Sequence, residues 1–529
     1  MFINTYAPYG ADGIIIRVEA DIRRGIPGID ITGLAQEAVR EARERVRAAF
    51  RNSGFVFPQD RVLINLAPAG LRKDGASLDL PIALAVMAAA GIVPIESPGG
   101  GELLVMGELE LSGRIRPVRG VLAAAAAALK AGIREFIVPA ENAGEAAILG
   151  SGCFAAVGTL AQAADVLLSR RETGSLSRSQ APALAAPTVV AFSGDFAEVR
   201  GQERYKRALE IAAAGGHNIL VFGPPGAGKT MLARRLPSIL PPLTAEEAVE
   251  VTRLHSLAGR TLAETEGRLI AHPPFRSPHH SASAEGILGG GKTVRPGEIS
   301  LAHFGALFLD EAPEFRSNVL QSLREPLEDR VITISRADGP VRLPADFQLV
   351  LAANPCPCGR LGMRSAAAGQ GCFCGAEEIR RYWRKFGAAL LDRVELRVAT
   401  SSPEPATMAD SKGENSAVIA ERVLRAVDIQ RRRFRDTPAR RNAGMSPAML
   451  ERFCPLSPHA EAAFRSAAEK LGLSGRAYHG IIRVARTIAD LEGQGDIKTV
   501  HLLEAIQHRR LGDDPYDVFS QESWGSPAP

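Results

Sequence analysis

Short apolar runs recur through the middle of the chain, and each is bounded by polar or glycine-rich residues. Four such runs are Ile219–Phe222, Ala306–Leu309, Phe347–Ala353 and Val394–Val398. Runs of this length are typical of strands that are buried on both faces of a parallel sheet. We therefore predict an α/β core, in which polar residues at the strand ends are the candidates for chemistry.

The run Ile219–Phe222 leads directly into a glycine-rich turn that ends in Lys229 and Thr230. Such a turn points consecutive backbone N–H groups at an anion, while the lysine reaches the terminal phosphates and the threonine hydroxyl binds Mg²⁺. The turn therefore predicts a site for ATP and Mg²⁺. Its residues are Gly223, Pro224, Pro225, Gly226, Ala227, Gly228, Lys229 and Thr230.

A second stretch, residues 286–293, has the same glycine, lysine and threonine spacing. No apolar strand precedes it, and Pro296 blocks a helix after it, so the structural context of a phosphate site is missing. We predict a flexible, cationic loop there.

Polar residues next to the other predicted strands could complete a hydrolysis site. Asp310 and Glu311 follow Ala306–Leu309, where Asp310 would lie near the Mg²⁺ and Glu311 against the attacking water. Asn354 follows Phe347–Ala353 and could orient that water, although an asparagine after a strand is more often a turn residue.

Arg393 opens the last predicted strand, Val394–Val398. It could project into the nucleotide site of a neighbouring subunit as an arginine finger. A lone arginine in such a place is more often part of a surface salt bridge. The agreement of these signals, in this order after one phosphate loop, favours an ATPase.

Four cysteines form two close pairs directly after Asn354: Cys356 with Cys358, and Cys372 with Cys374. Four thiolates at this spacing could hold a tetrahedral Zn²⁺ that stabilises a loop too short to build its own core. Cys-x-Cys pairs are closer than the usual Cys-x-x-Cys, so four reduced thiols are the alternative.

Composition is that of an ordinary globular protein and identifies no partner. Of 529 residues, 46% are apolar and 23% charged, and the net charge of +4 is too small to indicate nucleic acid. Met1–Gly10 shows no export signal, and Leu80–Ile95 is too short and too interrupted by proline to span a membrane comfortably. We expect a cytoplasmic protein with no membrane contact and a buried helix at 80–95.

Polar segments without periodicity divide the chain into three blocks joined by linkers. The predicted boundaries are 1–168 for an N-terminal domain, 169–190 for a linker, 191–400 for the core, 401–416 for a second linker, 417–511 for a helical lid, and 512–529 for a disordered tail.

Two segments on either side of Asp310 are rich in basic residues. Before it, a long interval contains Phe275, Arg276 and Lys292, a composition suited to a mobile loop. After it, Val331–Ile334 and Val341–Leu343 flank a turn containing Arg336, which predicts a β-hairpin. Solvated surface charges are the plain alternative for both segments.

Several longer motifs resemble those of one family. They are Phe275–Ser281, Gly297–His303, Leu390–Arg393 and Ala485–Leu491. The chain resembles AAA+ ATPases of the helix-2-insert group, which includes magnesium-chelatase motor subunits and replicative helicases. It is most similar to the magnesium-chelatase-like YifB/ComM family. The resemblance covers nearly the whole chain and implies an AAA+ P-loop NTPase core with a helical lid.

The resemblance also implies a function. It suggests a ring, a homo-hexamer, that uses ATP to move along single-stranded or branched DNA during homologous recombination, as in branch migration in natural transformation, in contact with recombination machinery. By the same analogy, the two basic segments would face the central channel, and Phe275, Arg276, Lys292 and Arg336 would contact DNA.

The lid contains two arginines that could contact the nucleotide. Arg476, in Ser474–Tyr478, resembles the lid arginine that touches the phosphates, and Arg483 is a second candidate. We favour Arg476 because it opens the predicted helix.

The N-terminal block resembles the C-terminal domain of Lon proteases, an α+β fold of the ribosomal S5 domain 2 type. The similarity lies in Lys73–Ser77 and Gly132–Pro139. Ser77 stands where the proteases have their serine, but Ala124 stands where the activating lysine should be. A serine without a base is weakly nucleophilic, so we expect no peptide hydrolysis.

Two other function classes use the same ATP site. A protein-remodelling chaperone or a chelatase-type motor would act on a protein partner instead of DNA. An ATP-dependent protease is disfavoured by Ala124.

Overall fold

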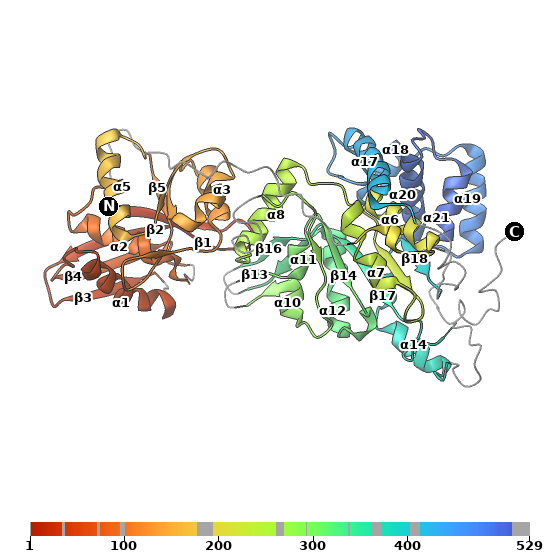
Figure 1. Cartoon of the computed structure of the whole chain (residues 1–529), viewed down its shortest axis with the longest axis horizontal. Helices are drawn as coiled ribbons and strands as arrows, with labels where there is room; N and C mark the ends of the chain where they lie inside the picture. Colours follow the sequence, from red (N-terminus) through yellow and green to blue (C-terminus); the bar gives the residue numbers. More distant parts are fainter. Residues whose placement is uncertain are drawn as a thin grey trace.

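The computed structural model describes residues 2–33, 37–70, 73, 75–95, 101–176, 194–260, 269–291, 294–336, 339–361, 372–401 and 413–509. The molecule is elongated, with the N-terminal domain at one end and the core and lid at the other (Figure 1). Most of the predicted linkers, 169–190 and 401–416, and the predicted tail, 512–529, lie outside the described residues.

The N-terminal domain is a mixed sheet covered by helices on both faces. Its strands are β1 (Phe2–Ala7), β2 (Ile14–Arg23), β3 (Gly28–Thr32), β4 (Arg61–Ala67), β5 (Leu103–Val105), β8 (Glu135–Pro139) and β9 (Cys153–Val157), in the order β3-β4-β2-β1-β5-β8-β9. Its helices are α1 (Glu37–Asn52), α2 (Asp79–Ala89), α3 (Val121–Lys130), α4 (Ala143–Ala147) and α5 (Leu160–Thr173). The short β6 (Glu108–Leu109) and β7 (Ile115–Arg116) form a separate pair.

Strand alternation assigns side chains to the two faces of this sheet. Ile16 and Val18 of β2 belong to the apolar cluster that contains α1, α2 and α5, whereas the preceding Ile15 packs with α3 and α4. Helix α2 is itself buried from Asp79 to Ala88, which explains why it is apolar nearly all round. This is the buried helix predicted for residues 80–95, although the helix ends at Ala89.

The core is a parallel five-stranded sheet. Its strands are β10 (Ile219–Phe222), β11 (Phe275–Arg276), β14 (Ala306–Leu309), β17 (Gln348–Ala353) and β18 (Leu396–Ala399), in the order β11-β14-β17-β10-β18. Its helices are α6 (Glu203–Gly215), α7 (Lys229–Ala233), α8 (Ala245–Leu257), α10 (Ala284–Leu288), α11 (Glu298–Leu301), α12 (Ser317–Ser322), α13 (Arg324–Asp329), α14 (Ala376–Arg384) and α15 (Ala388–Leu391). Two small antiparallel pairs, β12 (Gly289–Gly290) with β13 (Arg295–Pro296) and β15 (Val331–Ile334) with β16 (Val341–Pro344), lie outside this sheet.

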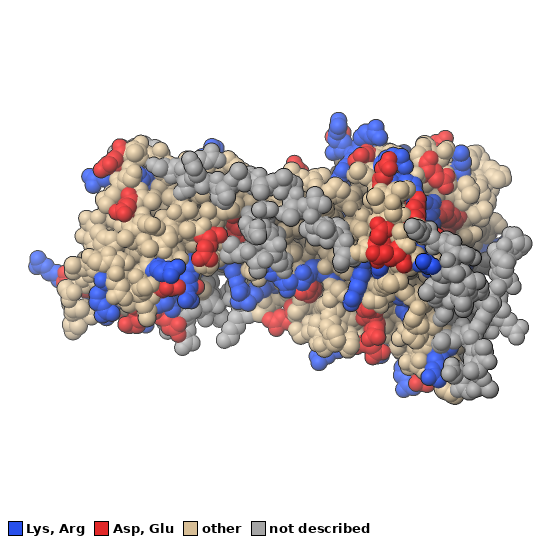
Figure 2. All heavy atoms as spheres, viewed as in Figure 1, with Lys and Arg blue, Asp and Glu red and all other residues tan. Residues whose placement is uncertain are grey.

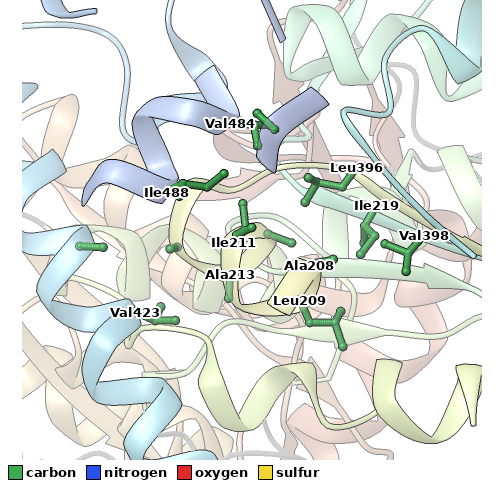
Figure 3. Packing of buried hydrophobic residues seen from close by; sticks show 14 of the residues in the cluster. Ala208, Leu209, Ile211, Ala213, Ile219, Leu396, Val398, Val423, Val484 and Ile488 are labelled. Carbon is green, nitrogen blue, oxygen red and sulfur yellow. The ribbon is translucent and has the colours of Figure 1, made fainter. Parts of the chain in front are cut away.

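The lid packs on one face of the core sheet. Its helices are α17 (Ser416–Arg433), α18 (Pro447–Phe453), α19 (Pro458–Lys470), α20 (Gly475–Leu491) and α21 (Thr499–Gln507). Figure 3 shows the contact, in which Ile211 of α6 lies between Ile219 of β10 and the lid residues Val423 and Ile488. One apolar cluster thus joins sheet, α6 and lid, so the lid is a continuation of the core.

The N-terminal domain contacts the core through α3 and the turn between β1 and β2. Leu257, at the end of α8, packs in the apolar cluster that contains Val121 of α3. Asp12 in the turn accepts a hydrogen bond from Arg253 of α8 at 3.0 Å. Gly10, with φ of +68°, lies so close to β16 that a Cβ would be 2.9 Å from the carbonyl oxygen of Arg342.

The fold confirms the predicted α/β core and the α+β domain before it. Two local predictions are wrong. Helix α5 continues to Thr173, beyond the predicted domain end at 168, because Arg170 is buried and donates to Glu135 of β8 at 2.8 Å. The second glycine-rich stretch is not wholly a loop, because α10 occupies its start and Gly289–Gly290 pairs with Arg295–Pro296.

No helix in the described part of the chain is long and apolar enough to cross a membrane.

Candidate ATPase site

The phosphate loop joins β10 to α7 and depends on glycine at three places. A Cβ on Gly223 would lie 2.3 Å from the carbonyl oxygen of Thr400, which follows β18. Gly226 and Gly228 have φ of +78° and +81°, a conformation that favours glycine. Gly228 is the residue before α7, so this backbone directs the chain from the strand into the helix.

Lys229 is almost fully buried, and its ammonium group lies inside the loop. Nζ donates to the carbonyl oxygens of Gly223 at 2.7 Å and Pro224 at 2.9 Å, and to Oδ1 of Asn354 at 3.2 Å. Burial lowers the pKa of Lys229 to about 8, and the negative charges of Asp310 and Glu311 partly oppose that shift. The cation and the two acidic residues therefore share one site.

The acidic pair follows β14, the second strand from β10. The backbone N–H of Glu311 donates to Oδ1 of Asp310 at 3.0 Å. Glu311 has φ of +49°, which turns its side chain away from the direction of the strand, and the side chain is 59% exposed. Nδ1 of His280 lies 4.0 Å from Oε2 of Glu311. Glu311 is thus accessible to water at the edge of the sheet.

These groups meet because the strands are parallel and in register. Phe222 pairs with Ala353, and Leu309 pairs with Leu351, so the residues after the strands lie at one edge of the sheet. The phosphate loop, Asp310 with Glu311, and Asn354 are therefore brought together as the sequence predicted. Thr230 follows Lys229 in α7, where its hydroxyl could join Asp310 in holding Mg²⁺.

Arg393 lies at the opposite edge. The strand it was expected to open begins at Leu396, whose partner Ile219 is the first residue of β10. The carbonyl oxygen of Arg393 accepts from Nδ2 of Asn218, just before β10, at 2.9 Å. A four-residue strand rises about 3.3 Å per residue, so roughly 13 Å of sheet separates the two edges. Arg393 cannot complete the site of its own chain.

Arg476 lies beside Arg393. Its guanidinium donates to Glu328 of α13 at 2.8 Å, and Arg393 donates to the same carboxylate. The hydrogen bond from Arg393 lowers the pKa of Glu328 below its usual range. Ser474 caps α20, so Arg476 lies in the first turn of the helix, as predicted. Sequence alone did not show that one arginine of the core and one of the lid share Glu328. The carboxylate is 65 residues from Arg393 and 148 from Arg476 along the chain.

Arg483, the other lid candidate, is mostly buried. Burial lowers the pKa of Arg483, and the negative charge of Glu395 opposes that shift. A side chain in this position stabilises the lid against the core, whereas Arg476 is 41% exposed and can reach a ligand from outside the chain.

The four predicted zinc ligands form one cluster. Their sulfur atoms all lie within 4.8 Å of one another. Cys356 is 3.3 Å from Cys358 and 3.7 Å from Cys372, and Cys358 is 3.6 Å from Cys372. Tetrahedral Zn²⁺ with bonds of about 2.3 Å requires sulfur separations of roughly 3.8 Å. The cysteines therefore fit a zinc ion, which would serve as a structural crosslink.

The predicted DNA contacts at Phe275 and Arg276 are not in a mobile loop. The two residues form β11, the edge strand paired with β14, and the ring of Phe275 stacks on Phe308 at 5.9 Å. Arg276 makes two hydrogen bonds to Glu298, at 2.7 and 3.0 Å. Because both residues belong to a paired strand, the mobile-loop prediction is wrong for them. The pairing with Glu298 also neutralises the charge of Arg276.

The hairpin prediction is confirmed, and it adds a basic residue that we had not singled out. Strands β15 and β16 pair, and Arg342 is exposed directly opposite the exposed Thr333. Arg336 follows β15 and is partly exposed, whereas Lys292 lies outside the described residues. Figure 2 shows basic side chains gathered over the part of the core that contains β13 and β16, beside the N-terminal domain.

Helix α3 carries no lysine at the position expected to activate Ser77. Ala124 is buried in α3, and the only lysine of that helix is its last residue, Lys130, which pairs with Asp12 at 3.4 Å. Lys73 is fully buried, and its Nζ donates to the carbonyl oxygens of Gly33, Leu66 and Pro68, a role that no sequence pattern indicates. Desolvation lowers the pKa of Lys73, while the three acceptors hold its ammonium group in a structural role.

A parallel five-stranded sheet with a phosphate loop, an acidic pair after a nearby strand and a packed helical lid defines an AAA+ ATPase. Family models agree over most of the chain: magnesium chelatase, subunit ChlI, matches residues 195–408; subunit ChlI of Mg-chelatase matches 18–142; and the ChlI C-terminal region matches 413–509. The chain belongs to the YifB/ComM family of magnesium-chelatase-like AAA+ proteins. This domain implies ATP hydrolysis with Mg²⁺.

Two named relatives match along nearly their full length, and a third matches in part. The uncharacterized protein YifB of Salmonella typhimurium is 42% identical, over 96% of this chain and 97% of its own. Competence protein ComM of Haemophilus influenzae is 39% identical, over 96% of this chain and 97% of its own. Lon protease of Salinispora arenicola is 30% identical over 167 residues, 30% of this chain and 21% of its own, a partial similarity.

Proposed function

We propose that this protein is a hexameric ring ATPase that moves along single-stranded or branched DNA and promotes branch migration in homologous recombination during natural transformation. The observation that carries the proposal is the placement of Arg393 and Arg476 on Glu328, at the edge of the sheet opposite the phosphate loop. Cations that stabilise the transferred phosphate must lie at the nucleotide. These two arginines lie away from the phosphate loop of their own chain, so they could act only on a nucleotide bound by a neighbouring subunit. A closed ring supplies each subunit with one.

DNA as the substrate has separate support. A relative that matches over 96% of this chain is named a competence protein. The exposed Arg342 on the β15–β16 hairpin, with Arg336 after β15, offers basic groups that suit phosphate contacts. Recombination machinery is the partner class that fits such a motor.

The decisive experiment compares DNA with unfolded protein as stimulants of ATP hydrolysis. We expect branched or single-stranded DNA to raise turnover and unfolded protein to leave it unchanged. The double change Arg336→Ala and Arg342→Ala should weaken DNA binding and reduce the slope of log affinity against log salt by about two, since each lost phosphate contact removes about one.

Arg425→Ala is the matched control, because Arg425 is an exposed arginine of α17 paired with Glu421 and remote from the hairpin in sequence. If unfolded protein alone stimulates ATP hydrolysis, the proposal of a DNA motor is wrong and a protein-remodelling function takes its place. If neither DNA nor unfolded protein stimulates hydrolysis, both proposals are wrong.

The proposed cofactors are ATP, Mg²⁺ and one Zn²⁺ per chain. Elemental analysis of protein purified without chelator should find the zinc. Absence of metal, with Cys356, Cys358, Cys372 and Cys374 all freely titratable, would leave the cluster as four reduced thiols.

A further inference from the structure

Two residues flanking the cysteine cluster, Gly359 and Trp383, lie close to the start of the phosphate loop. We propose that the cysteine cluster and Trp383 position the phosphate loop, so that binding of the metal and binding of the nucleotide strengthen each other. This inference rests on the proposed zinc site, and it concerns nucleotide affinity measured in the absence of DNA.

Trp383 makes the first connection. It is buried in α14, and its indole N–H donates to the carbonyl oxygen of Pro355 at 3.0 Å. Pro355 directly precedes the ligand Cys356. The same indole ring meets Phe222 edge-on, with centroids 5.5 Å apart and planes at 85°. Phe222 is the last residue of β10, immediately before the phosphate loop.

Gly359 makes the second connection. It directly follows the ligand Cys358 and has φ of +75°. A Cβ on Gly359 would lie 3.1 Å from Cδ of Pro225, inside the phosphate loop, and 3.9 Å from Cγ of Asn354. The backbone at Gly359 therefore leaves little room for a side chain beside Pro225 of the loop, and it lies near Asn354, which binds Lys229.

The remaining ligands fix the helix that carries Trp383. Cys374 is separated from the start of α14 by one residue, Gly375. A metal ion that joins the two cysteine pairs would thus hold α14 to the segment 355–359. It would thereby fix Trp383, which meets Phe222 just before the phosphate loop, and Gly359, which lies near Pro225 within the loop.

The physical consequence is a linkage between two ligands. A loop too small to build its own core gains its order from the metal. Without metal, the contacts at Pro355 and Gly359 would fluctuate, and a nucleotide would have to order the phosphate loop as it binds. Thermodynamic reciprocity requires that the factor by which metal raises nucleotide affinity equals the factor by which nucleotide raises metal affinity.

The experiment measures this factor in both directions on the full chain. Calorimetry gives the affinity for a non-hydrolysable ATP analogue in zinc-loaded protein and after chelation. Competition with a chromophoric chelator gives the zinc affinity with and without the analogue. We expect about a tenfold change in each case, within the usual range of coupling between sites. Equal analogue affinities before and after confirmed loss of zinc would overturn the proposal.

Two variants test the route. Trp383→Phe keeps an aromatic ring against Phe222 but removes the indole donor, so zinc and analogue should both still bind while the coupling factor falls toward one. Gly359→Ala should weaken analogue binding more than zinc binding, because the added Cβ would lie 3.1 Å from Cδ of Pro225 in the phosphate loop. Undiminished coupling in Trp383→Phe would assign Trp383 a packing role only and overturn its part in the proposal.

A spectroscopic signal provides an independent check. The chain has two tryptophans, Trp383 and Trp524, so Trp524→Phe leaves Trp383 as the sole source of indole emission. Both chelation and analogue binding should shift that emission, because each changes the surroundings of the same ring. A shift on chelation without any shift on analogue binding would overturn the link to the phosphate loop. Protein that binds no metal at all would overturn the zinc site itself, and the coupling with it.

Discussion

The two edges of the core sheet carry different halves of a hydrolysis site. At the carboxyl ends of the strands lie the phosphate loop, the acidic pair Asp310 and Glu311, and Asn354, whose amide contacts Lys229. At the amino ends lie Arg393 and Arg476, both bound to Glu328. One edge can bind and activate, while the other supplies cations. In the ring that we propose, the difference means that the two half-sites of each chain would face different neighbours.

Loss of Arg393 should give the largest effect. Arg393→Ala should bind ATP normally but lose at least about 10³-fold in turnover, the range typical of arginine fingers. Lys229→Ala should lose nucleotide binding because the cation of the loop is gone. Mixing the two inactive proteins should restore some hydrolysis, since an intact phosphate loop can then face an intact arginine across one interface.

The mixing experiment needs rings proven to contain both variants, for example by native mass spectrometry. A mixture of Lys229→Ala with Arg425→Ala, which keeps Arg393, sets the activity expected from dilution alone. Mixed rings of Arg393→Ala and Lys229→Ala with no recovered activity, once a need for coordinated firing around the ring is excluded, would place Arg393 in its own subunit or in a structural role.

Changing the activating edge should have the next largest effect. Glu311→Gln keeps the size of the side chain but removes the base, so ATP should still bind while turnover falls about 10²- to 10⁴-fold. The same variant should hold rings on DNA, because the bound nucleotide persists. Single-turnover hydrolysis measures the first effect, and unchanged hydrolysis would exclude Glu311 from water activation.

Substitutions of the two lid arginines should affect different properties of the protein, one its turnover and the other its stability. Arg476→Ala should lower turnover about tenfold with little change in thermal stability, since its exposed side chain lies at the cationic edge. Arg483→Ala should lower the melting temperature, because a buried guanidinium is removed from beside Glu395. Paired melting curves and hydrolysis rates distinguish the roles, and a reversed pattern would make Arg483 the lid sensor.

The smallest predicted effect concerns pH. Burial lowers the pKa of Lys229 to about 8, so the free protein loses this charge as the pH rises through 8. ATP phosphates favour the ammonium form, so binding above pH 8 should take up a proton, and affinity should fall by up to about tenfold per unit. Calorimetry in buffers of different ionisation enthalpy measures the proton, and Lys229→Arg, which stays charged, should abolish its uptake.

Sequence patterns predicted the carboxyl edge better than the amino edge. Ile219–Phe222 and Ala306–Leu309 match β10 and β14 because short apolar runs suffice for strands buried on both faces. The strand β11 escaped notice because two residues have no periodicity, and only the pairing of Arg276 with Glu298 shows that its charge is satisfied.

Contacts between distant parts of the chain explain the other differences. Helix α5 passes its predicted end because Arg170 binds Glu135, and Arg393 shares Glu328 with a lid residue that lies 83 positions further along the chain. Pattern analysis treats each segment separately, so partners of this kind become visible only once the fold brings them together.

The contact between the N-terminal domain and α8 has a practical consequence for anyone who shortens this chain. A core without residues 1–168 would expose the apolar face that buries Leu257 and would leave Arg253 without Asp12. Uncovering one buried leucine costs about 1.5–3 kcal/mol, and a fresh apolar face promotes aggregation. Aggregation or low stability of such a fragment would therefore reflect the loss of this domain interface. A loss of activity in the fragment would then say nothing about catalysis.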